Sequence, residues 1–439
     1  MALVWLTQLP FILSPAEATL RLTGEPDLTW LDGGLEHGRE GRYSFVAAGA
    51  AEVREANFGE PQPLALLDTL TLPSAQATGG PAAGELSRED VPHWIGHVAY
   101  DAHGFGQARS RHVRDQRVPV VRFARYAALF AHDHATGRSF VAADDEISGR
   151  ALVARLGQEA PIFDPRFSVG DVSVTPDSRH CDAVRRALHH VREGDVYEIN
   201  LARRFWAPFQ GSALGLFLRM RALSPVPFGY FAQSSQHAVL GRSMERFLRY
   251  RVRDRALWTS PIKGTIARQG DDAAEAQSLQ ADPKEHAEHA MVVDLMRNDL
   301  SRVAEVGSVQ VTELMTVLPF AGLSHLISTV RATALPDLTL ATLLAQTFPP
   351  GSVTGTPKER ALEIIESLED GARGLYTGAV GFVDRAGGLS LAVAIRTALV
   401  SEGSLEYFAG GGIVWGSDAQ RETAETELKA QVFLRALKA

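Results

Sequence analysis

Short runs of alternating or continuous apolar residues recur in the first third of the chain. They predict strands at residues 42–48, 93–100 and 118–123, where β-branched and aromatic side chains are frequent. Residues 72–90 are rich in Gly, Ala, Pro and Ser and predict a loop. The apolar N-terminus predicts an ordinary first strand rather than a signal peptide, because it lacks Lys and Arg and is interrupted by Gln8 and Pro10.

The pattern changes after a second break at residues 157–175. Apolar residues at helical spacing then predict a helix over 178–193, and strand-like runs return at 239–242, 378–383 and 389–396. Strands therefore occur in both halves of the chain without strict alternation with helices. We predict an α+β fold with large antiparallel β-sheets rather than a doubly wound parallel sheet.

A glycine-rich turn precedes another predicted helix. The segment Gly351-Ser-Val-Thr-Gly355-Thr-Pro-Lys358 is similar to a phosphate loop, but two residues separate Gly355 from Lys358, where a P-loop has none. We predict instead that Thr356 caps a helix over 357–368, with Glu359 completing a capping box. The backbone N–H groups of the turn remain candidates for binding an anion.

The composition excludes several classes of protein. The 439 residues include 44 Lys and Arg and 52 Asp and Glu, a formal net charge of −8, which does not favour nucleic-acid binding. With 45% hydrophobic and 22% charged residues, a folded globular protein is expected. No apolar run is long enough to predict a membrane span. The single cysteine, Cys181, excludes intrachain disulfides and multi-cysteine metal sites, and is typical of a cytoplasmic protein.

Two predicted helices each bear a pair of carboxylates on one face. In the first, Glu285, Glu288 and Val292 follow i, i+3, i+7 spacing. The neighbouring His286 and His289 are three residues apart, which does not match the zinc-binding His-Glu-x-x-His motif. A solvated charged helix face and a site for a hard cation both remain possible for this segment.

The second acidic helix lies near the C-terminus. Ser417 is predicted to cap it, Glu422 and Glu425 share a face, and Lys429 follows one turn later. Such pairs repel weakly, so each is tolerable as a surface feature. If the two pairs converge, they would form a site for Mg²⁺, which prefers carboxylate oxygens and binds anionic substrates.

Several sequence blocks in a fixed order resemble the chorismate-utilising enzymes. The resemblance covers most of residues 175–439, and the first third is similar only through Gly41-Arg-Tyr-Ser-Phe45. It implies a sandwich of large antiparallel β-sheets flanked by helices, with chorismate and Mg²⁺ in a central cleft. The blocks are residues 195–205, 261–265, 284–302, 324–330, 351–365, 373–382, 395–397 and 409–414.

The resemblance also implies roles for individual residues. Glu288 and Glu425 match direct Mg²⁺ ligands, with Glu285 and Glu422 beside them and acting partly through water. A guanidinium and glycine backbone N–H groups suit the recognition of a substrate carboxylate. The implied substrate-binding residues are Thr354, Tyr376, Arg396, Gly410, Gly411, Gly412 and Lys429, and His325 matches an active-site histidine.

Two positions distinguish the branches of this family. Isochorismate and salicylate synthases have a lysine base where this chain has Glu198, so water addition is disfavoured. Most amine-adding relatives carry Gln there, and Glu198 matches neither pattern. The block Pro261-Ile-Lys-Gly-Thr265 resembles the aminodeoxychorismate synthases, whereas anthranilate synthases have Ala in place of Lys263.

In the aminodeoxychorismate branch this lysine is proposed to attack C2 of chorismate and displace the C4 hydroxyl, after which ammonia adds at C4. Glu245 matches the acid that protonates the departing hydroxyl. Attack requires a neutral amine, and a lysine with a pKa of about 10.4 is only about 0.04% neutral at pH 7. We therefore expect a lowered pKa for Lys263 and a raised pKa for Glu245. An ordinary strand lysine is the alternative for Lys263.

The resemblance implies a partner as well. Ammonia would come from a separate glutamine amidotransferase subunit, because Cys181 is not in a nucleophile elbow and the length leaves no room for a fused glutaminase or lyase. We expect an N-terminal region, 1–160, packed on a catalytic unit, 175–439, as part of the same large sheets. Residues 30–33 differ from the motif at the tryptophan pocket of anthranilate synthases, which makes that pocket doubtful; the sequence does not decide whether tryptophan binds here. Anthranilate synthase component I and a silent metal-binding subunit are the alternative functions.

Overall fold

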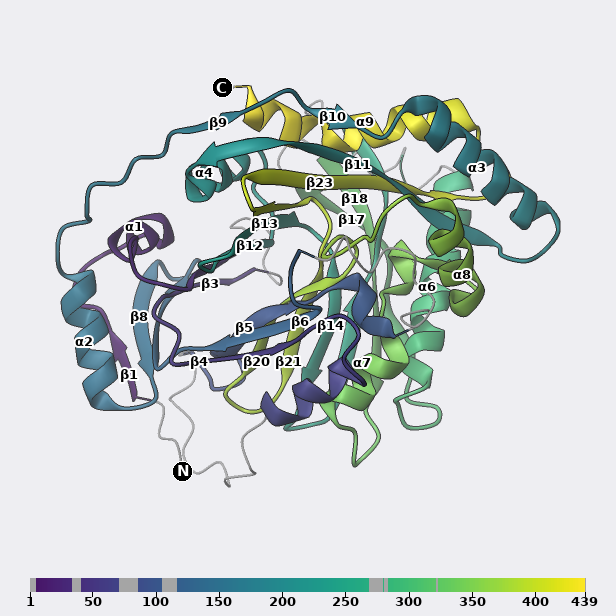
Figure 1. Cartoon of the computed structure of the whole chain (residues 1–439). Coiled ribbons are helices and arrows are strands. Elements are labelled where there is room, and N and C mark those ends of the chain that lie inside the picture. The colour runs from purple at the N-terminus through teal and green to yellow at the C-terminus, as the bar shows by residue number, and fades with distance from the viewer. Residues whose placement is uncertain are drawn as a thin grey trace.

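Two antiparallel β-sheets form the core of the computed structural model, which describes residues 5–33, 41–70, 86–104, 117–267, 279, 283–320 and 323–438. Figure 1 shows helices flanking the sheets and strands from distant parts of the chain lying side by side. Each strand pair in the described ranges is antiparallel. The predicted α+β fold with large antiparallel β-sheets is confirmed.

The larger sheet has 13 strands within the described ranges. Its order is β1-β8-β7-β3-β2-β12-β13-β22-β23-β11-β10, and β9 and β19 also pair with β11. The strands are β1 (Trp5–Gln8), β2 (Leu28–Asp32), β3 (Tyr43–Ala47), β7 (Ala128–Asp133), β8 (Arg138–Ala143), β9 (Phe167–Val169), β10 (Ser173–Val174), β11 (Glu198–Gly211), β12 (Phe228–Gln233), β13 (His237–Ser243), β19 (Gly355–Thr356), β22 (Thr397–Ser401) and β23 (Ser404–Ile413).

The smaller sheet has ten strands within the same ranges. Its order is β16-β18-β15-β14-β21-β20-β5-β6-β4, and β17 pairs with β18. The strands are β4 (Glu52–Ala56), β5 (Pro92–Val98), β6 (Val121–Arg125), β14 (Arg246–Arg251), β15 (Ala256–Ser260), β16 (Ile262–Ala267), β17 (Gln310–Phe320), β18 (Leu323–Thr333), β20 (Ala379–Asp384) and β21 (Leu389–Val393).

Helices cover the sheet faces that do not meet. The larger sheet is covered by α1 (Pro15–Arg21), α2 (Glu146–Leu156), α4 (Ala213–Leu223) and α9 (Ala419–Leu437), and the smaller by α6 (Pro283–Ser301), α7 (Leu340–Thr347) and the 3₁₀ helix η1 (Pro63–Leu70). The remaining helices are α3 (Asp177–Arg192), α8 (Lys358–Leu368) and the 3₁₀ turns η2 (Tyr100–His103) and η4 (Gly351–Val353).

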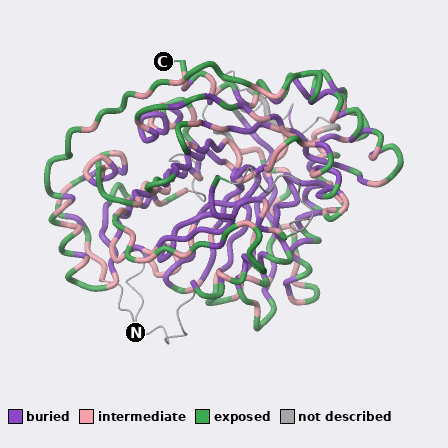
Figure 2. Tube along the Cα trace, in the orientation of Figure 1, coloured by how far each residue is buried: buried purple, intermediate pink, exposed green. Residues whose placement is uncertain are grey.

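Strand periodicity explains how the larger sheet buries both faces. In β3, Phe45 and Ala47 pack with Ile95 of the smaller sheet, whereas Val46 between them packs with Ala18 of α1. Successive side chains of a strand point to opposite faces, so one strand contributes to two cores. Figure 2 shows the resulting buried strands in the middle of the molecule and exposed residues on the outer helices and turns.

Most elements lie where the sequence predicts them. The predicted helix over 178–193 is α3, and the predicted strands are β3, β5, β6, β13, β20 and β21, with the first strand at β1. The predicted break at 157–175 is wrong in part, because it contains the short strands β9 and β10, which pair with β11. Of the predicted loop at 72–90, residues 72–85 lie outside the described ranges.

Two helix starts differ from their predictions. Pro357, not Thr356, occupies the N-cap of α8, and no side chain caps it. Thr356 pairs with Glu198 as part of β19. The N-cap of α9 is Asp418, whose side chain accepts hydrogen bonds from two backbone N–H groups, whereas the Ser417 hydroxyl accepts one from Val414. In both cases the next residue occupies the N-cap position, because Thr356 pairs with β11 and the Ser417 hydroxyl binds the backbone N–H of Val414.

Both sheets combine strands from residues 1–160 and 175–439. In the larger sheet β2 pairs with β12, and in the smaller sheet β5 pairs with β20. The two ranges thus share both sheets rather than each forming its own.

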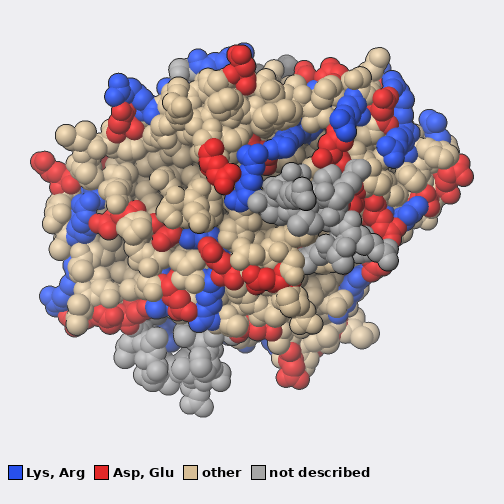
Figure 3. All heavy atoms as spheres, in the orientation of Figure 1, with Lys and Arg blue, Asp and Glu red and all other residues tan. Residues whose placement is uncertain are grey.

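Two surface properties bear on the expected partners. Among the described helices, none is both long and apolar enough to span a bilayer. Figure 3 shows acidic and basic side chains interspersed over the described part of one face, without a continuous basic band. This distribution agrees with the slightly acidic overall charge.

Candidate active site

A buried ion pair joins the two sheets at the candidate site. Nζ of Lys263, on β16, lies 2.8 Å from Oε1 of Glu198, the first residue of β11. The two side chains are only 16% and 5% exposed. Residues from two different sheets therefore meet through one charge-assisted hydrogen bond.

The Glu198 carboxylate decides the protonation of Lys263. Burial disfavours the ammonium, but the attraction and hydrogen bond of Glu198 outweigh it, and with smaller contributions from Glu288 and Glu245 they raise the pKa of Lys263. The expected lowering of this pKa is wrong for this geometry. Lys263 rests as an ammonium ion, and the residue responsible is the one whose role the sequence left unexplained.

Glu245 lies between β13 and β14, close enough to Lys263 for their charges to interact. The hydroxyl of Ser352 donates a hydrogen bond of 2.6 Å to its Oε1, and the backbone N–H of Ile262 also donates to it. Burial raises the pKa of Glu245 to about 7 against these opposing contacts. The raised pKa agrees with expectation and suits an acid that works near neutral pH.

Three glycines of β23 let functional groups approach the backbone closely. A Cβ atom would lie 2.4 Å from Oε1 of Glu198 at Gly412, and 2.7 Å from the Tyr376 hydroxyl at Gly410. At Gly411 it would lie 3.3 Å from Nζ of Lys429. A side chain at the first two positions would displace a polar group, which explains their glycines.

Lys429 of α9 and Arg396 meet at the same strand. Lys429 donates a hydrogen bond of 2.9 Å to the carbonyl oxygen of Gly410 and pairs with Glu425 at 2.6 Å. The Arg396 guanidinium donates to the Lys429 carbonyl oxygen, and its backbone has a φ of 53°, which is uncommon for a residue with a side chain. The structure thus gathers two cations beside the glycines of β23.

Two aromatic residues complete this region. The ring of Tyr376 stacks on Phe408, with centroids 5.4 Å apart. His325 of β18 lies with Nδ1 3.2 Å from the carbonyl oxygen of Gly264. Burial lowers the pKa of His325 to about 4, so its imidazole is neutral at pH 7.

The four predicted metal ligands approach the site from two helices. Glu422 and Glu425 of α9 each have a carboxylate oxygen 3.6 Å from a Cβ built on Gly411, and Glu285 of α6 lies 3.1 Å from one built on Gly264. Glu288 acts electrostatically on Lys263. Within the described ranges, no three acidic, His or Cys side chains are close enough to form an assembled metal site. The carboxylate chemistry nevertheless fits a hard divalent cation.

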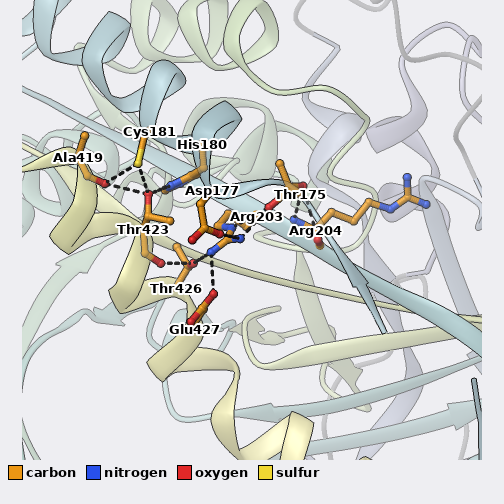
Figure 4. Close-up of polar contacts among 10 residues, drawn as sticks. All are labelled: Thr175, Asp177, His180, Cys181, Arg203, Arg204, Ala419, Thr423, Thr426 and Glu427. Carbon is orange, nitrogen blue, oxygen red and sulfur yellow. Dashed lines mark hydrogen bonds and ion pairs between the residues drawn. The ribbon is translucent and has the colours of Figure 1, made fainter. Parts of the chain in front are cut away.

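A buried arginine anchors α9 against β11 and α3 (Figure 4). Arg203 of β11 is fully buried, and its guanidinium donates to the Thr175 carbonyl oxygen at 2.7 Å and to Asp177 of α3 at 2.5 Å. It also donates to Glu427 of α9 at 3.3 Å. Through this contact the helix that bears Glu422, Glu425 and Lys429 is held over the larger sheet.

A second set of contacts secures the start of the same helix. His180 and Cys181 of α3 both lie against the hydroxyl of Thr423 on α9, at 2.8 and 3.3 Å. Cys181 is buried, in agreement with a structural rather than a catalytic thiol. Neither contact was evident from the sequence, because the partners are distant in the chain.

The glycine-rich turn serves the site differently from expectation. Thr354 is fully buried, and its hydroxyl donates to the carbonyl oxygens of Pro350 and Gly351 in its own turn. The carboxylate of Asp299 lies near the backbone N–H of Gly351 and accepts a hydrogen bond of 2.7 Å from Lys358. The sequence did not predict that Ser352 donates a hydrogen bond to Glu245. Its position in the glycine-rich turn was the one indication that it could lie at the site.

One protein family matches nearly the whole chain. The family described as chorismate binding enzyme matches residues 34–435. The chain belongs to the chorismate-binding enzyme family. The fold and the order of the sequence blocks agree with this assignment.

Relatives of this chorismate-binding enzyme have two different names. Aminodeoxychorismate synthase component 1 of Klebsiella aerogenes is 42% identical over 256 residues, which cover 58% of the chain and 56% of that protein. Anthranilate synthase component 1 of Saccharolobus solfataricus is 34% identical over 367 residues, covering 80% and 83%. The match thus spans little more than half of the Klebsiella relative, although its identity is higher.

Solved structures share the fold over nearly the whole chain. Anthranilate synthase component I from Streptococcus pneumoniae matches with a TM-score of 0.74 and 28% identity, covering 97% of this chain and 98% of that one. The menaquinone-specific isochorismate synthase of Escherichia coli also gives 0.74, at 20% identity and covering 100% and 95%. The second likeness concerns the fold alone.

This chorismate-binding enzyme also has a cavity of about 300 Å³ between the sheets, away from Lys263. Its lining includes Leu31, Asp32 and Gly33, together with Tyr230 and Phe382. The sequence of residues 30–33 made a tryptophan pocket doubtful. A cavity lies beside residues 31–33, and its presence does not test tryptophan binding.

Proposed function

We propose that the chain is aminodeoxychorismate synthase component I, which converts chorismate and ammonia to 4-amino-4-deoxychorismate. The observation that supports this most directly is the buried amine of Lys263, flanked by Glu198 at 2.8 Å and by the protonatable Glu245. A lysine at this position distinguishes the aminodeoxychorismate branch from the anthranilate branch. Its burial favours a reacting group over an ordinary strand lysine, whose ammonium normally reaches water.

The proposed reaction assigns complementary roles to the two groups. Lys263 attacks C2 of the ring as the C4 hydroxyl departs, and Glu245 gives its proton to that hydroxyl, so that water leaves. Ammonia then adds at C4 and expels the lysine, and the proton lost by the new amino group restores Glu245. The substrate carboxylates would be bound by Arg396, Tyr376, Lys429 and the backbone of Gly410–Gly412, which lie near one another, with His325 as a neutral imidazole close to Arg396.

A divalent cation and a partner complete the proposal. Glu288 and Glu425 would hold Mg²⁺ directly, with Glu285 and Glu422 beside them, and the ion when bound would supply positive charge for a substrate carboxylate. Ammonia would be delivered by a separate glutamine amidotransferase subunit; the relatives' designation as component 1 is in keeping with a second component. The product would feed the synthesis of 4-aminobenzoate and folate in the cytoplasm.

Anthranilate synthase component I is the second candidate. It is favoured by relatives of that name that cover more of the chain, such as 80% in Saccharolobus solfataricus and 97% in Thermus thermophilus. The two functions differ in the carbon that receives nitrogen and in whether the side chain of the substrate is lost.

Product identification separates the candidates. The protein is incubated with chorismate, Mg²⁺ and an ammonium salt, and the products are identified by mass spectrometry. We expect aminodeoxychorismate, which an added lyase converts to 4-aminobenzoate. Anthranilate as the product would contradict the proposal in favour of the second candidate, and no turnover would indicate a silent subunit.

A further inference from the structure

The proposed reaction requires a group that removes a proton from Lys263. Only a neutral amine can attack a carbon atom, yet the surroundings of Lys263 hold it as an ammonium ion. Before a C–N bond forms, one of the protons on Nζ must be transferred to an acceptor within hydrogen-bonding distance.

Within the described ranges, the side chains whose charges act on Lys263 or are acted on by it include Glu198, Glu245, Glu288, His289 and Lys429. Glu245 is needed in its protonated form for the leaving hydroxyl, and Glu288 is a proposed cation ligand. Nε2 of His289 contacts the hydroxyl of Ser328 at 2.6 Å, and its buried Nδ1 forms no hydrogen bond with Nζ of Lys263. Nζ of Lys429 is engaged with the Gly410 carbonyl oxygen and with Glu425. Glu198 lies 2.8 Å from Nζ and accepts a hydrogen bond from it, so the path for the proton already exists.

We propose that Glu198 is the catalytic base that takes the proton from Lys263, an inference that rests on the proposed function. One N–H bond of Nζ breaks as Oε1 of Glu198 gains the proton. The freed electron pair of Nζ then forms the bond to C2, the two conjugated ring double bonds shift from C1=C2 and C5=C6 to C1=C6 and C4=C5, and the C4–O bond breaks as its oxygen takes the proton of Glu245. When ammonia adds at C4, the C2–N bond breaks, and the neutral amine regains its proton from Glu198.

The position of Glu198 favours this transfer. Its carboxyl is 5% exposed, and its backbone is fixed by pairing with Thr356. The missing side chain at Gly412 leaves room for Oε1, which a Cβ would approach to 2.4 Å. Burial penalises both charges of the ion pair, so the neutral pair formed by proton transfer is closer in free energy than it would be in water.

The same position explains why this residue differs from its counterparts. A glutamine, as in most amine-adding relatives, has the shape and hydrogen-bonding oxygen of Glu198 but cannot accept the proton. A lysine, as in the water-adding branch, would place a second cation against Lys263. A carboxylate base at this position therefore distinguishes this chain from most of its branch. Glu198→Gln removes the proton-accepting carboxylate with little change in the shape of the side chain.

The test follows covalent bond formation in the full-length protein. Wild type and Glu198→Gln are mixed with chorismate and Mg²⁺ but without ammonium, and samples are quenched at intervals. Intact-protein mass spectrometry then measures the fraction of protein that carries the substrate adduct on Lys263. We expect an adduct in wild type and a rate about 100-fold lower in Glu198→Gln, the typical contribution of a general base. The dissociation constant of chorismate should change less than about threefold, because the substrate carboxylates are bound elsewhere.

A second measurement separates a base from a simple counter-charge. Reductive methylation of Lys263 by formaldehyde, with cyanoborohydride as the hydride donor, at pH 7.5 and without substrate, should be faster in Glu198→Gln, because loss of the carboxylate favours the neutral amine. Lys358, buried and paired with Asp299 at 2.7 Å, is the internal control and should react at an unchanged rate. A base predicts faster methylation but slower adduct formation, whereas a counter-charge predicts that both become faster.

Three results would overturn the inference. An adduct rate in Glu198→Gln equal to or above that of wild type assigns Glu198 a counter-charge role. Wild type that forms no adduct and yields anthranilate overturns the proposed function and this inference together. If Lys358 also changes its reactivity, the fold is altered and Glu198→Asp replaces Glu198→Gln; its shorter carboxylate should slow adduct formation at least tenfold, and an unchanged rate rejects the base.

Discussion

Oε1 of Glu245 accepts a hydrogen bond of 2.6 Å from the hydroxyl of Ser352 in a site without access to solvent. The pKa of this carboxyl is raised to about 7, so about half of the molecules hold the proton at neutral pH. Because the acid form is the one proposed to act, kcat/KM should fall about tenfold per pH unit above pH 7. A pH–rate profile with chorismate and ammonium at a constant concentration of free ammonia measures this limb.

Glu245→Gln is the control for that assignment. It should lower kcat by roughly 100-fold and abolish the limb near pH 7. A limb that persists in this variant would belong to another group. Because folding raises the pKa of Glu245, its protonated form stabilises the folded protein. This contribution to the free energy of unfolding is complete below about pH 4.5 and is lost as the pH rises through about 7.

Lys263→Ala should abolish formation of aminodeoxychorismate from chorismate and ammonia. The substitution removes the amine proposed to attack C2, whereas the exposed Lys438→Ala, at the end of α9, should leave the rate unchanged. Mass spectrometry of the products is the measurement. Full activity of Lys263→Ala would exclude the covalent route, and anthranilate formation by this variant would support the proposed difference between branches.

Glu288→Gln should weaken Mg²⁺ binding by at least about tenfold, the loss typical even of groups that only support metal ligands. Calorimetric titration of the protein with Mg²⁺ measures this directly, independently of turnover. Glu363→Gln, on the half-exposed surface of α8, is the matched control. A binding curve identical to that of wild type would refute the ligand role of Glu288.

Gly412→Ala tests the close approach beneath the ion pair. The added Cβ would lie 2.4 Å from Glu198 and 3.2 Å from Nζ of Lys263, so both groups must move. Displacement of about 1 Å in a reacting site costs roughly 100-fold in rate. Gly416→Ala, where a Cβ meets nothing within 4 Å, should be nearly neutral. Equal steady-state rates for the two variants would contradict the described geometry.

Arg203→Ala should lower the free energy of unfolding by roughly 2–4 kcal/mol, because it removes a large buried side chain and its hydrogen bonds to Thr175 and α9. Denaturant unfolding measures the change. The exposed Arg185→Ala, on α3, should cost less than about 0.5 kcal/mol. A loss as small for Arg203 would show that α9 is held mainly by its apolar face.

Local pattern was sufficient to predict much of the fold. The strands β3, β5 and β20 follow from their apolar runs, and α3 from its helical spacing, because each buries one continuous face. The break at 157–175 misled because β9 and β10 are too short to produce a periodic pattern. The cap residues also misled, since Thr356 pairs with Glu198 in β19 and Ser417 has the equally suitable Asp418 beside it.

The sequence predicted which residues lie together at the candidate site, but not their electrostatics, and their roles stay predictions. Motif blocks identified Lys263, Glu245 and the glycines of β23, and the structure brings these together. The pKa of Lys263 depends on Glu198, which lies 65 positions away and meets it only because two sheets stack. Spacing along a chain contains no information on such a distance, so the direction of this shift could not be derived from the sequence.

The interleaving of strands has a consequence for how the chain is made. β5 needs β20 as its neighbour in the smaller sheet, and β2 needs β12 in the larger one. During synthesis, β2 therefore lacks one neighbouring strand until residues 228–233 leave the ribosome, and β5 lacks one until residues 379–384 do. Such long-range pairing folds slowly and leaves unpaired edges exposed, so newly made chains depend on protection during synthesis more than the finished enzyme does.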